Sequence, residues 1–174
     1  MSTNWALPTT ISQYSEPGAE NAHIRWDDVN NFSSLKYSNG KFVKTERDLL
    51  HIAREPKHDI IEKTYYLRLT GYTFTNIPTV VSGIEMRLTM NRFGRISDET
   101  VQLCLNESVI GNNFADVDLG PIKVYGSISD LWDSNATLLS IQDASFGVVL
   151  RFKSHPSWPH KNSALIDAVE IRVH

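Results

Sequence analysis

The chain has little cysteine, no long apolar run and no surplus of basic residues. Its 174 residues include one cysteine, Cys104, which excludes an intrachain disulfide and a zinc site built from several cysteines. The apolar runs are only a few residues long, whereas a helix that crosses a bilayer needs about 20. Residues 1–5 carry neither a basic region nor an apolar core, so we expect no signal peptide. These absences indicate a soluble protein made in a reducing compartment.

The charge balance argues against two classes of partner. Seventeen basic residues stand against twenty acidic ones, which gives a net charge of -3. We therefore expect neither nucleic acid nor a membrane surface as a partner. Hydrophobic residues make up 41% and charged residues 21%, a composition that excludes wholesale disorder. The length favours one main domain.

Residues 1–59 show neither the helix period nor the strand period, and we interpret them as an N-terminal arm. Asn39-Gly40 predicts a hairpin turn, because both residues tolerate positive φ. Thr45 is a candidate N-cap for a short helix that Pro56 would end, with a strand as the alternative.

Aromatic residues run through this arm, so it is not a solvated tail. A segment of this kind must lay its rings on a preformed surface, either its own domain or a neighbouring subunit. Since they lie farthest from the second region in sequence, we take Trp5, Ile11 and Tyr14 as candidate assembly contacts.

Residues 60–174 alternate apolar and polar positions in several short runs, the pattern of strands with one buried face. Turn residues separate the runs, and no long amphipathic helix interrupts them. We predict an all-β domain, an antiparallel β-sandwich of jelly-roll type. The residues expected inside are Ile84, Met86, Leu88, Val101, Leu103, Leu105, Val148, Leu150, Phe152, Val169 and Ile171.

The sequence contains no glycine-rich phosphate loop, nucleophile elbow or zinc-protease motif. Cys104 lies within an alternating strand, so we do not expect it to act as a nucleophile. Several histidines and aspartates could in principle reach a metal, but their spacing is poor and turns favour aspartate for backbone reasons. These residues are His155, His160, Asp116, Asp118, Asp130 and Asp133. We expect no catalytic residue, no metal and no cofactor.

Four aromatic residues define an alternative function. Exposed side by side, they would form a platform on which sugars stack, and the chain would be a carbohydrate-binding or host-receptor-binding module. Buried, they are structural, which is what we expect of Trp132 and Trp158. The four residues are Tyr72, Tyr125, Trp132 and Trp158.

Four motifs in the second region carry a resemblance to a known family. A strand ends in Tyr125-Gly126, a loop carries Asp130-Leu131-Trp132, a strand begins Phe146-Gly147-Val148, and a final strand reads Ile166-Asp167-Ala168-Val169-Glu170-Ile171. Together they resemble the C-terminal half of β-sandwich proteins encoded by tailed bacteriophages. The resemblance covers about residues 65–174. Asp133 stands where the pattern more often has glycine, and the loop from His155 to His160 is longer.

The resemblance implies a structural component of a tailed bacteriophage virion, assembled in the host cytoplasm. Capsid decoration, a neck or collar part, and a tail or baseplate adaptor are the roles it suggests. The partners would be other virion proteins and copies of the chain itself. The pattern names no catalytic residue, and the varied loops leave the binding partner open.

Overall fold

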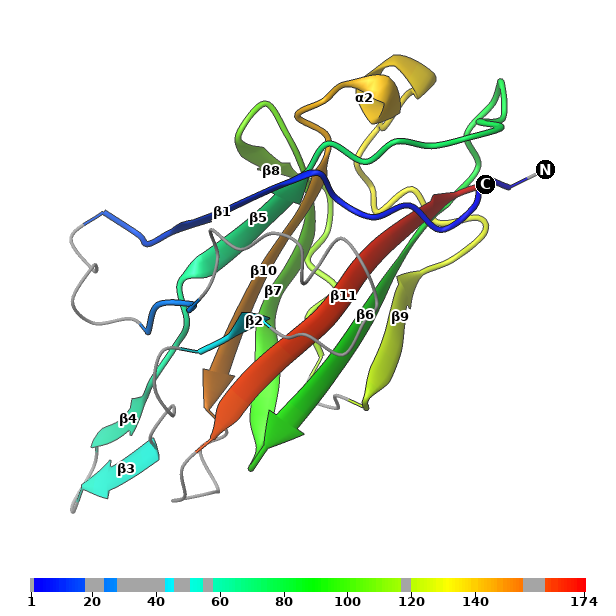
Figure 1. The fold of residues 1–174 in the computed structure, drawn as a ribbon. Helices are drawn as coiled ribbons and strands as arrows, with labels where there is room; N and C mark the ends of the chain where they lie inside the picture. Colours follow the sequence, from blue (N-terminus) through cyan, green and yellow to red (C-terminus); the bar gives the residue numbers. More distant parts are fainter. Residues whose placement is uncertain are drawn as a thin grey trace.

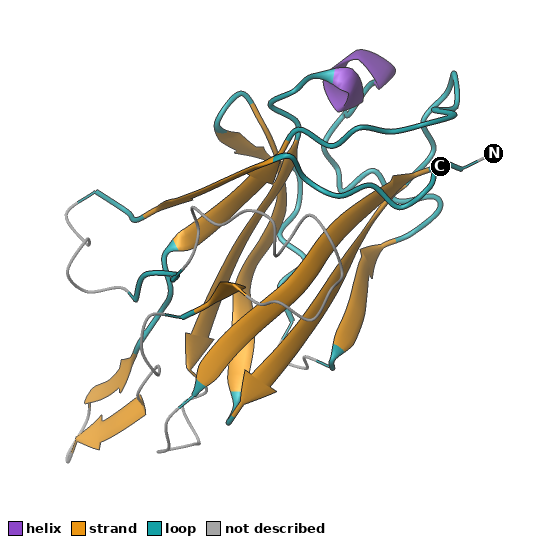
Figure 2. Ribbon diagram, viewed as in Figure 1, coloured by secondary structure: helices purple, strands orange, loops and turns teal. Residues whose placement is uncertain are grey.

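A computed structural model gives the structure of the chain, and it describes residues 2–17, 24–27, 43–45, 51–54, 58–116, 120–154 and 162–174. Strands build most of it, and helix α2 (Leu138–Gln142) lies at one end (Figures 1 and 2). The strands are β1 (Thr10–Tyr14), β2 (Val43–Lys44), β3 (His51–Arg54), β4 (His58–Ile61), β5 (Tyr66–Thr70), β6 (Ile84–Phe93), β7 (Ile96–Leu105), β8 (Ser108–Ile110), β9 (Ile122–Gly126), β10 (Gly147–Ser154) and β11 (Ser163–Val173).

Two antiparallel sheets face each other across one hydrophobic core (Figure 1). The five-stranded sheet has the order β1-β5-β10-β7-β8, and the four-stranded sheet has the order β2-β11-β6-β9. Strands β3 and β4 form a separate hairpin. The prediction of an all-β fold with antiparallel sheets is confirmed.

The buried positions follow the predicted alternation. Side chains on a strand point to opposite faces in turn, so one face of each strand enters the core. The residues expected inside are fully buried except for Leu105, which is half-buried at the end of β7 next to the exposed β8 turn. The strand register was therefore predicted correctly from the apolar pattern.

The outer face of β10 differs from the expected wet face. Val149 and Arg151 alternate with core residues, yet they are 0% and 1% exposed. Strand β10 is central in its sheet. On the outer face, Glu16 and Tyr66 accept hydrogen bonds from Arg151. Cys104, on the neighbouring β7, is also fully buried, and burial raises the pKa of its thiol to about 12.

Part of the predicted arm lies within the two sheets. Strand β1 pairs with β5 along its whole length, and its Ile11 is buried in the core. Closer to the start, Ala6 pairs with Ile171 of β11, and the Thr3 N–H donates to the Val173 carbonyl (2.8 Å). These backbone bonds add the segment to the open edge of β11.

Trp26 also packs inside the chain and not on its surface. It is 3% exposed, its ring meets Phe152 edge to face at 5.8 Å, and its indole N–H donates to the Tyr65 carbonyl (2.9 Å). A buried indole needs such a partner for its N–H. The predicted turn at Asn39-Gly40 lies outside the described residues.

The helix predicted after Thr45 is wrong at its described residues. Thr45 bridges Trp26 and donates its N–H to the Ala164 carbonyl (3.2 Å), and residues 46–50 lie outside the described residues. Ile52 and Ala53 belong to β3, which pairs with β4. The alternative of a strand holds there, because pairing in a hairpin overrides a weak helix preference.

Helix α2 has only five residues and was not predicted. Thr137 caps it: the hydroxyl accepts from the Ser140 N–H (3.3 Å), and Ile141 is its buried residue. No helix within the described ranges is long and apolar enough to cross a membrane.

Two of the motifs that carry the family resemblance have a role in packing. Gly126 adopts φ 76°, and a side chain there would overlap the Ile84 carbonyl and the Trp132 indole. The Asp130 carboxylate accepts from the Trp132 N–H (2.6 Å). Asp133 has φ 53°, a conformation that explains why glycine suits that position. These contacts hold the loop after β9 against the start of β6.

Candidate functional site

A trough of about 430 Å³ lies on the outer face of the five-stranded sheet. Strands β1 and β5 supply one side of its lining, and β7 and β8 supply the other, with the central β10 between them. The lining residues are Tyr14, Ser15, Glu16, Pro17, Tyr66, Thr100, Gln102 and Val109.

Two tyrosines form a rigid aromatic side of this trough. Tyr14 and Tyr66 are directly opposite each other on β1 and β5, and their rings stack at 5.0 Å with 17° between the planes. The Arg68 guanidinium lies 4.6 Å from the Tyr14 ring, and the Arg151 guanidinium lies 4.4 Å from the Tyr66 ring. Burial raises the pKa of both tyrosines, so both phenols are neutral at physiological pH.

Arg151 holds the segment after β1 against the sheet. Its Nη1 donates to Glu16 Oε1 (2.6 Å) and to Tyr66 Oη (2.8 Å), and its Nε donates to the Thr64 carbonyl (3.1 Å). The Tyr66 hydroxyl also donates to Glu16 Oε1 (3.0 Å). A buried guanidinium needs several such partners. Because Arg151 has them, the side of the trough is fixed before any ligand arrives.

The remaining lining residues are uncharged. Gln102 donates through Nε2 to the Gly111 carbonyl (2.7 Å), which sets the direction of its amide. Thr100 contributes a hydroxyl, and Val109 a half-exposed apolar side chain. Arg68 spans toward the β8 turn, where its Nη2 donates to the Glu107 carbonyl (2.8 Å).

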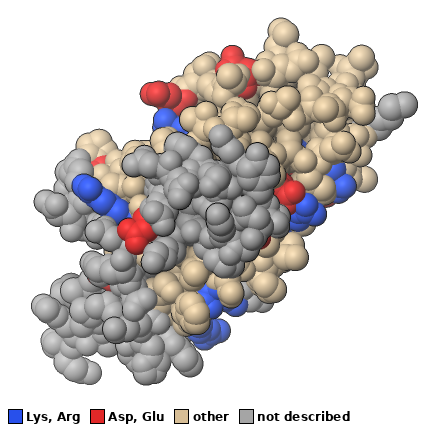
Figure 3. Space-filling model, viewed as in Figure 1, with Lys and Arg blue, Asp and Glu red and all other residues tan. Residues whose placement is uncertain are grey.

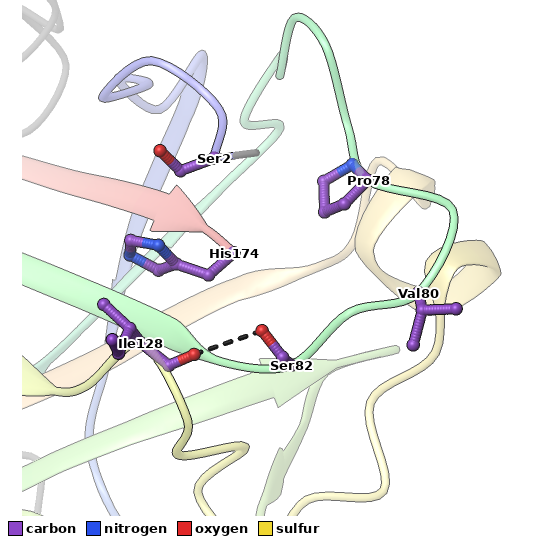
Figure 4. Close-up of a pocket in the computed structure, with 6 residues that line it drawn as sticks. All are labelled: Ser2, Pro78, Val80, Ser82, Ile128 and His174. Atoms are coloured by element: carbon purple, nitrogen blue, oxygen red, sulfur yellow. Dashed lines mark hydrogen bonds between the residues drawn. The ribbon is translucent and has the colours of Figure 1, made fainter.

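A second hollow, of about 370 Å³, lies near the start of β6 and the end of β11. Figure 4 shows His174 between Ser2 and Ile128, with Pro78 and Val80 farther along the loop that precedes β6. The Ser82 hydroxyl donates to the Ile128 carbonyl (3.1 Å), and the His174 ring bonds to Glu85 (2.7 Å). Ser82 and His174 are thus committed to different partners and do not form a nucleophile and its base.

The outer face of the four-stranded sheet carries two ion pairs between β6 and β11. Arg87 binds Glu170 through two hydrogen bonds of 2.7 Å, and Arg172 binds Glu85 (2.9 and 2.5 Å). Trp5 lies over both, 4.4 Å from the Arg87 guanidinium and 4.6 Å from that of Arg172. Where Figure 3 shows described residues, blue and red groups lie next to each other, and no broad area of one sign is visible.

The edge of this sheet is apolar. On β9, Val124 is opposite Arg87 and Ile122 is opposite Thr89, so both lie on the outer face. They are 46% and 62% exposed. Among the described residues β9 pairs only with β6, which leaves its other backbone edge open. At the opposite side of the sheet, β2 and Ala6 cover the edge of β11.

The structure does not bring the predicted sugar platform to the surface. Tyr72, Tyr125 and Trp132 are 7%, 4% and 0% exposed, and Trp158 lies outside the described residues. Trp132 donates its indole N–H to the Ile84 carbonyl (2.8 Å) and packs on Phe114. The prediction that Trp132 is covered is confirmed, and the three described rings cannot stack on a ligand.

The predicted assembly residues have three different placements. Ile11 belongs to the core and cannot contact another chain. Trp5 is half-buried on the outer face of the four-stranded sheet, and Tyr14 is in the trough. Sequence reasoning missed Tyr66 and Arg151, although their alternation with buried leucine and phenylalanine places both on an outer face.

The loop aspartates have local partners. Asp116 accepts from Lys123 Nζ (2.7 Å), and Asp130 accepts from the Trp132 N–H. His155, His160 and Asp118 lie outside the described residues. Within the part of the chain that the structure describes, no three His, Cys, Asp or Glu side chains come close enough to hold a metal.

Comparison with known proteins leaves the family open. No protein-family model matches the chain, and searches of curated proteins and of solved structures found no match.

Proposed function

We propose that the chain is a non-enzymatic structural component of a tailed bacteriophage virion and acts through protein–protein contacts. Its partners would be other virion proteins and further copies of itself, met during assembly in the host cytoplasm. Capsid decoration, a neck or collar part, and a tail or baseplate adaptor all fit this role. The motif resemblance supports the phage origin, and strand β9 supports the mode of action.

Strand β9 is the observation that carries the proposal. An open strand edge with exposed apolar side chains is a template for pairing with another chain, and proteins that stay monomeric protect such edges. Among the described residues, no strand pairs with the edge of β9 that carries Ile122 and Val124, and the one charge on the strand, Lys123, is paired with Asp116. Trp5 and Arg87 beside them are of the residue types that dominate binding energy at interfaces.

We include jelly-roll topology in the proposal. Strand β6 pairs with β11 in one sheet, while the next strand, β7, pairs with β10 in the other. The first of two consecutive strands thus pairs with the last strand, and the second with the last but one. Folding one long two-stranded ribbon across two sheets produces this nesting, which is the basis of the jelly roll.

The test combines a double variant with labelling of particles. We expect the unaltered protein to self-associate and Ile122→Asp/Val124→Asp to be monomeric in light scattering, with the same circular dichroism spectrum. Val109→Asp is the matched control, because Val109 is 48% exposed on the edge strand of the other sheet. An antibody to the chain should label purified parent particles in electron micrographs.

Each part of the proposal can fail separately. Absence of label on intact particles contradicts the virion role. Self-association that survives the double variant contradicts the contact at β9.

A further inference from the structure

We propose that the trough on the five-stranded sheet binds a neutral saccharide. The proposal assigns a ligand to residues outside the predicted platform, and it does not depend on the virion role. If the virion role holds, the trough would give the particle a contact to glycan that is separate from its assembly surface.

The charges in the trough favour a neutral ligand. None of the eight lining residues is Lys or Arg, and Glu16 is the one carboxylate among them. Arg151 and the Tyr66 hydroxyl both donate to Glu16 Oε1, so its charge is compensated within the protein. An anionic ligand would find no lining cation, and an ordinary cation would compete with Arg151 for Glu16.

The polar groups favour a hydroxyl-rich ligand over a purely apolar one. Ser15, Thr100 and Gln102 are polar lining residues of a surface that also holds two tyrosines and Val109. Sugars present both kinds of surface, since hydroxyls surround apolar C–H faces. Binding sites commonly combine an aromatic lining with a few polar groups that fix orientation.

The rigidity of the trough supports binding without rearrangement. Tyr14 and Tyr66 stack on each other and are held by arginines, and the backbone of both belongs to paired strands. Gln102 is oriented by its bond to the Gly111 carbonyl. Side chains ordered in advance lose less entropy on binding. The volume, about 430 Å³, is within the range of small-molecule sites.

The experiment uses the full chain and a stated panel of probes. Maltohexaose, cellohexaose, laminarihexaose and chitohexaose are the neutral probes, and an alginate hexamer is the anionic probe, each titrated by calorimetry. We expect at least one neutral probe to bind and the alginate not to bind. Val109→Trp should fill the trough and weaken that binding by about ten-fold or more. Val80→Trp, at an exposed valine outside the trough, should leave the affinity unchanged.

The outcomes decide the proposal. Gln102→Ala gives a second variant that removes a lining amide without adding bulk, and we expect it to weaken binding too. Binding that is the same in both trough variants, binding of alginate alone, or no binding by the unaltered protein would overturn the proposal. A trough variant that loses saccharide binding but still self-associates would separate this site from the contact proposed at β9.

Discussion

The outer faces of the two sheets come from the same alternating sequence pattern, but different groups cover them. On the five-stranded sheet, the central strand is covered by Glu16 and Tyr66, and a trough remains beside them. On the four-stranded sheet, ion pairs cross from β6 to β11, and an apolar strand forms the edge. The difference comes from segments distant in sequence. Residues 15–17 lie on the first face, and Trp5 lies over the ion pairs of the second.

The arginines on the two outer faces differ in burial. Arg151 is 1% exposed and serves as a fixed structural centre. Arg87 and Arg172 keep about a third of their side chains exposed, so water screens their ion pairs. The same residue type thus holds the side of the trough in place on one sheet and forms solvent-screened ion pairs on the outer face of the other.

The largest expected loss of stability comes from replacing Trp132, which contacts a strand of one sheet and the segment that follows the other. Trp132→Ala removes the indole that bonds to Ile84 of the four-stranded sheet and packs on Phe114, which follows the five-stranded sheet. We expect the free energy of unfolding to fall by about 3–5 kcal/mol in urea titrations. Both saccharide binding and self-association should be lost together. A loss of one alone would show that Trp132 supports only one sheet.

The next effect compares the arginines directly. Arg151→Ala removes the donor to the Thr64 carbonyl and one of the donors to the Glu16 carboxylate, and we expect a loss of about 3 kcal/mol of unfolding free energy. Arg172→Ala breaks a screened pair and should cost about 1 kcal/mol or less. Equal costs in urea titrations would contradict the distinction between the two faces.

A smaller effect concerns the bond between the sheets from Tyr125 on β9 to Asp98 on β7 (2.7 Å). Burial raises the pKa of Asp98, despite the hydrogen bonds from Tyr125 and the Asp116 N–H. The stability that the Asp98 carboxyl contributes is therefore fully present below the pKa of the unfolded state, about 4. It is lost as pH rises through the pKa of the folded state. Asp98→Asn should flatten that decline in urea titrations at stepped pH. An unchanged slope would show that another group titrates.

The smallest effect has the opposite sign and belongs to the four-stranded sheet. Burial would raise the pKa of Glu85, but hydrogen bonds from Arg172 and His174 outweigh it and lower the pKa. This stabilisation is present above the unfolded pKa and is lost as pH falls through the folded pKa. Glu85→Gln should cost about 1 kcal/mol or less at neutral pH and nothing in acid, by the same titration. A cost that persists in acid would point to packing instead.

The strands of the second half could be predicted because each carries its own alternation. Ile84, Met86 and Leu88 place one face of β6 inside without reference to any other strand. Strand β1 could not be found in this way, since Ile11 is its one fully buried residue. Its place depends on pairing with β5, a contact between segments far apart in sequence. The irregular appearance of the first residues therefore hid a strand of the sheet.

The candidate site was predictable only in fragments. The sequence marks Tyr14 as a candidate contact with another chain, whereas its partner Tyr66 alternates with buried leucines in β5 and carries no signal of a site. The prediction of an exposed platform is wrong because Tyr125 and Trp132 have partners inside the protein: Tyr125 bonds to Asp98 of the other sheet, and Trp132 occupies the space left by Gly126. The sequence shows which aromatic side chains need a packing partner, but the register between paired strands decides on which face of the sheet each one lies.

Because Cys104 is buried, a label that reacts with thiols can be directed to a cysteine introduced elsewhere without first removing Cys104. With its pKa raised to about 12 and no exposed surface, this thiol is inert toward maleimides at neutral pH. A cysteine introduced at Val124 or at Val109 would then be the one reactive thiol of the molecule. A fluorophore at the first position would report contacts at the open strand edge, and one at the second would report occupancy of the trough.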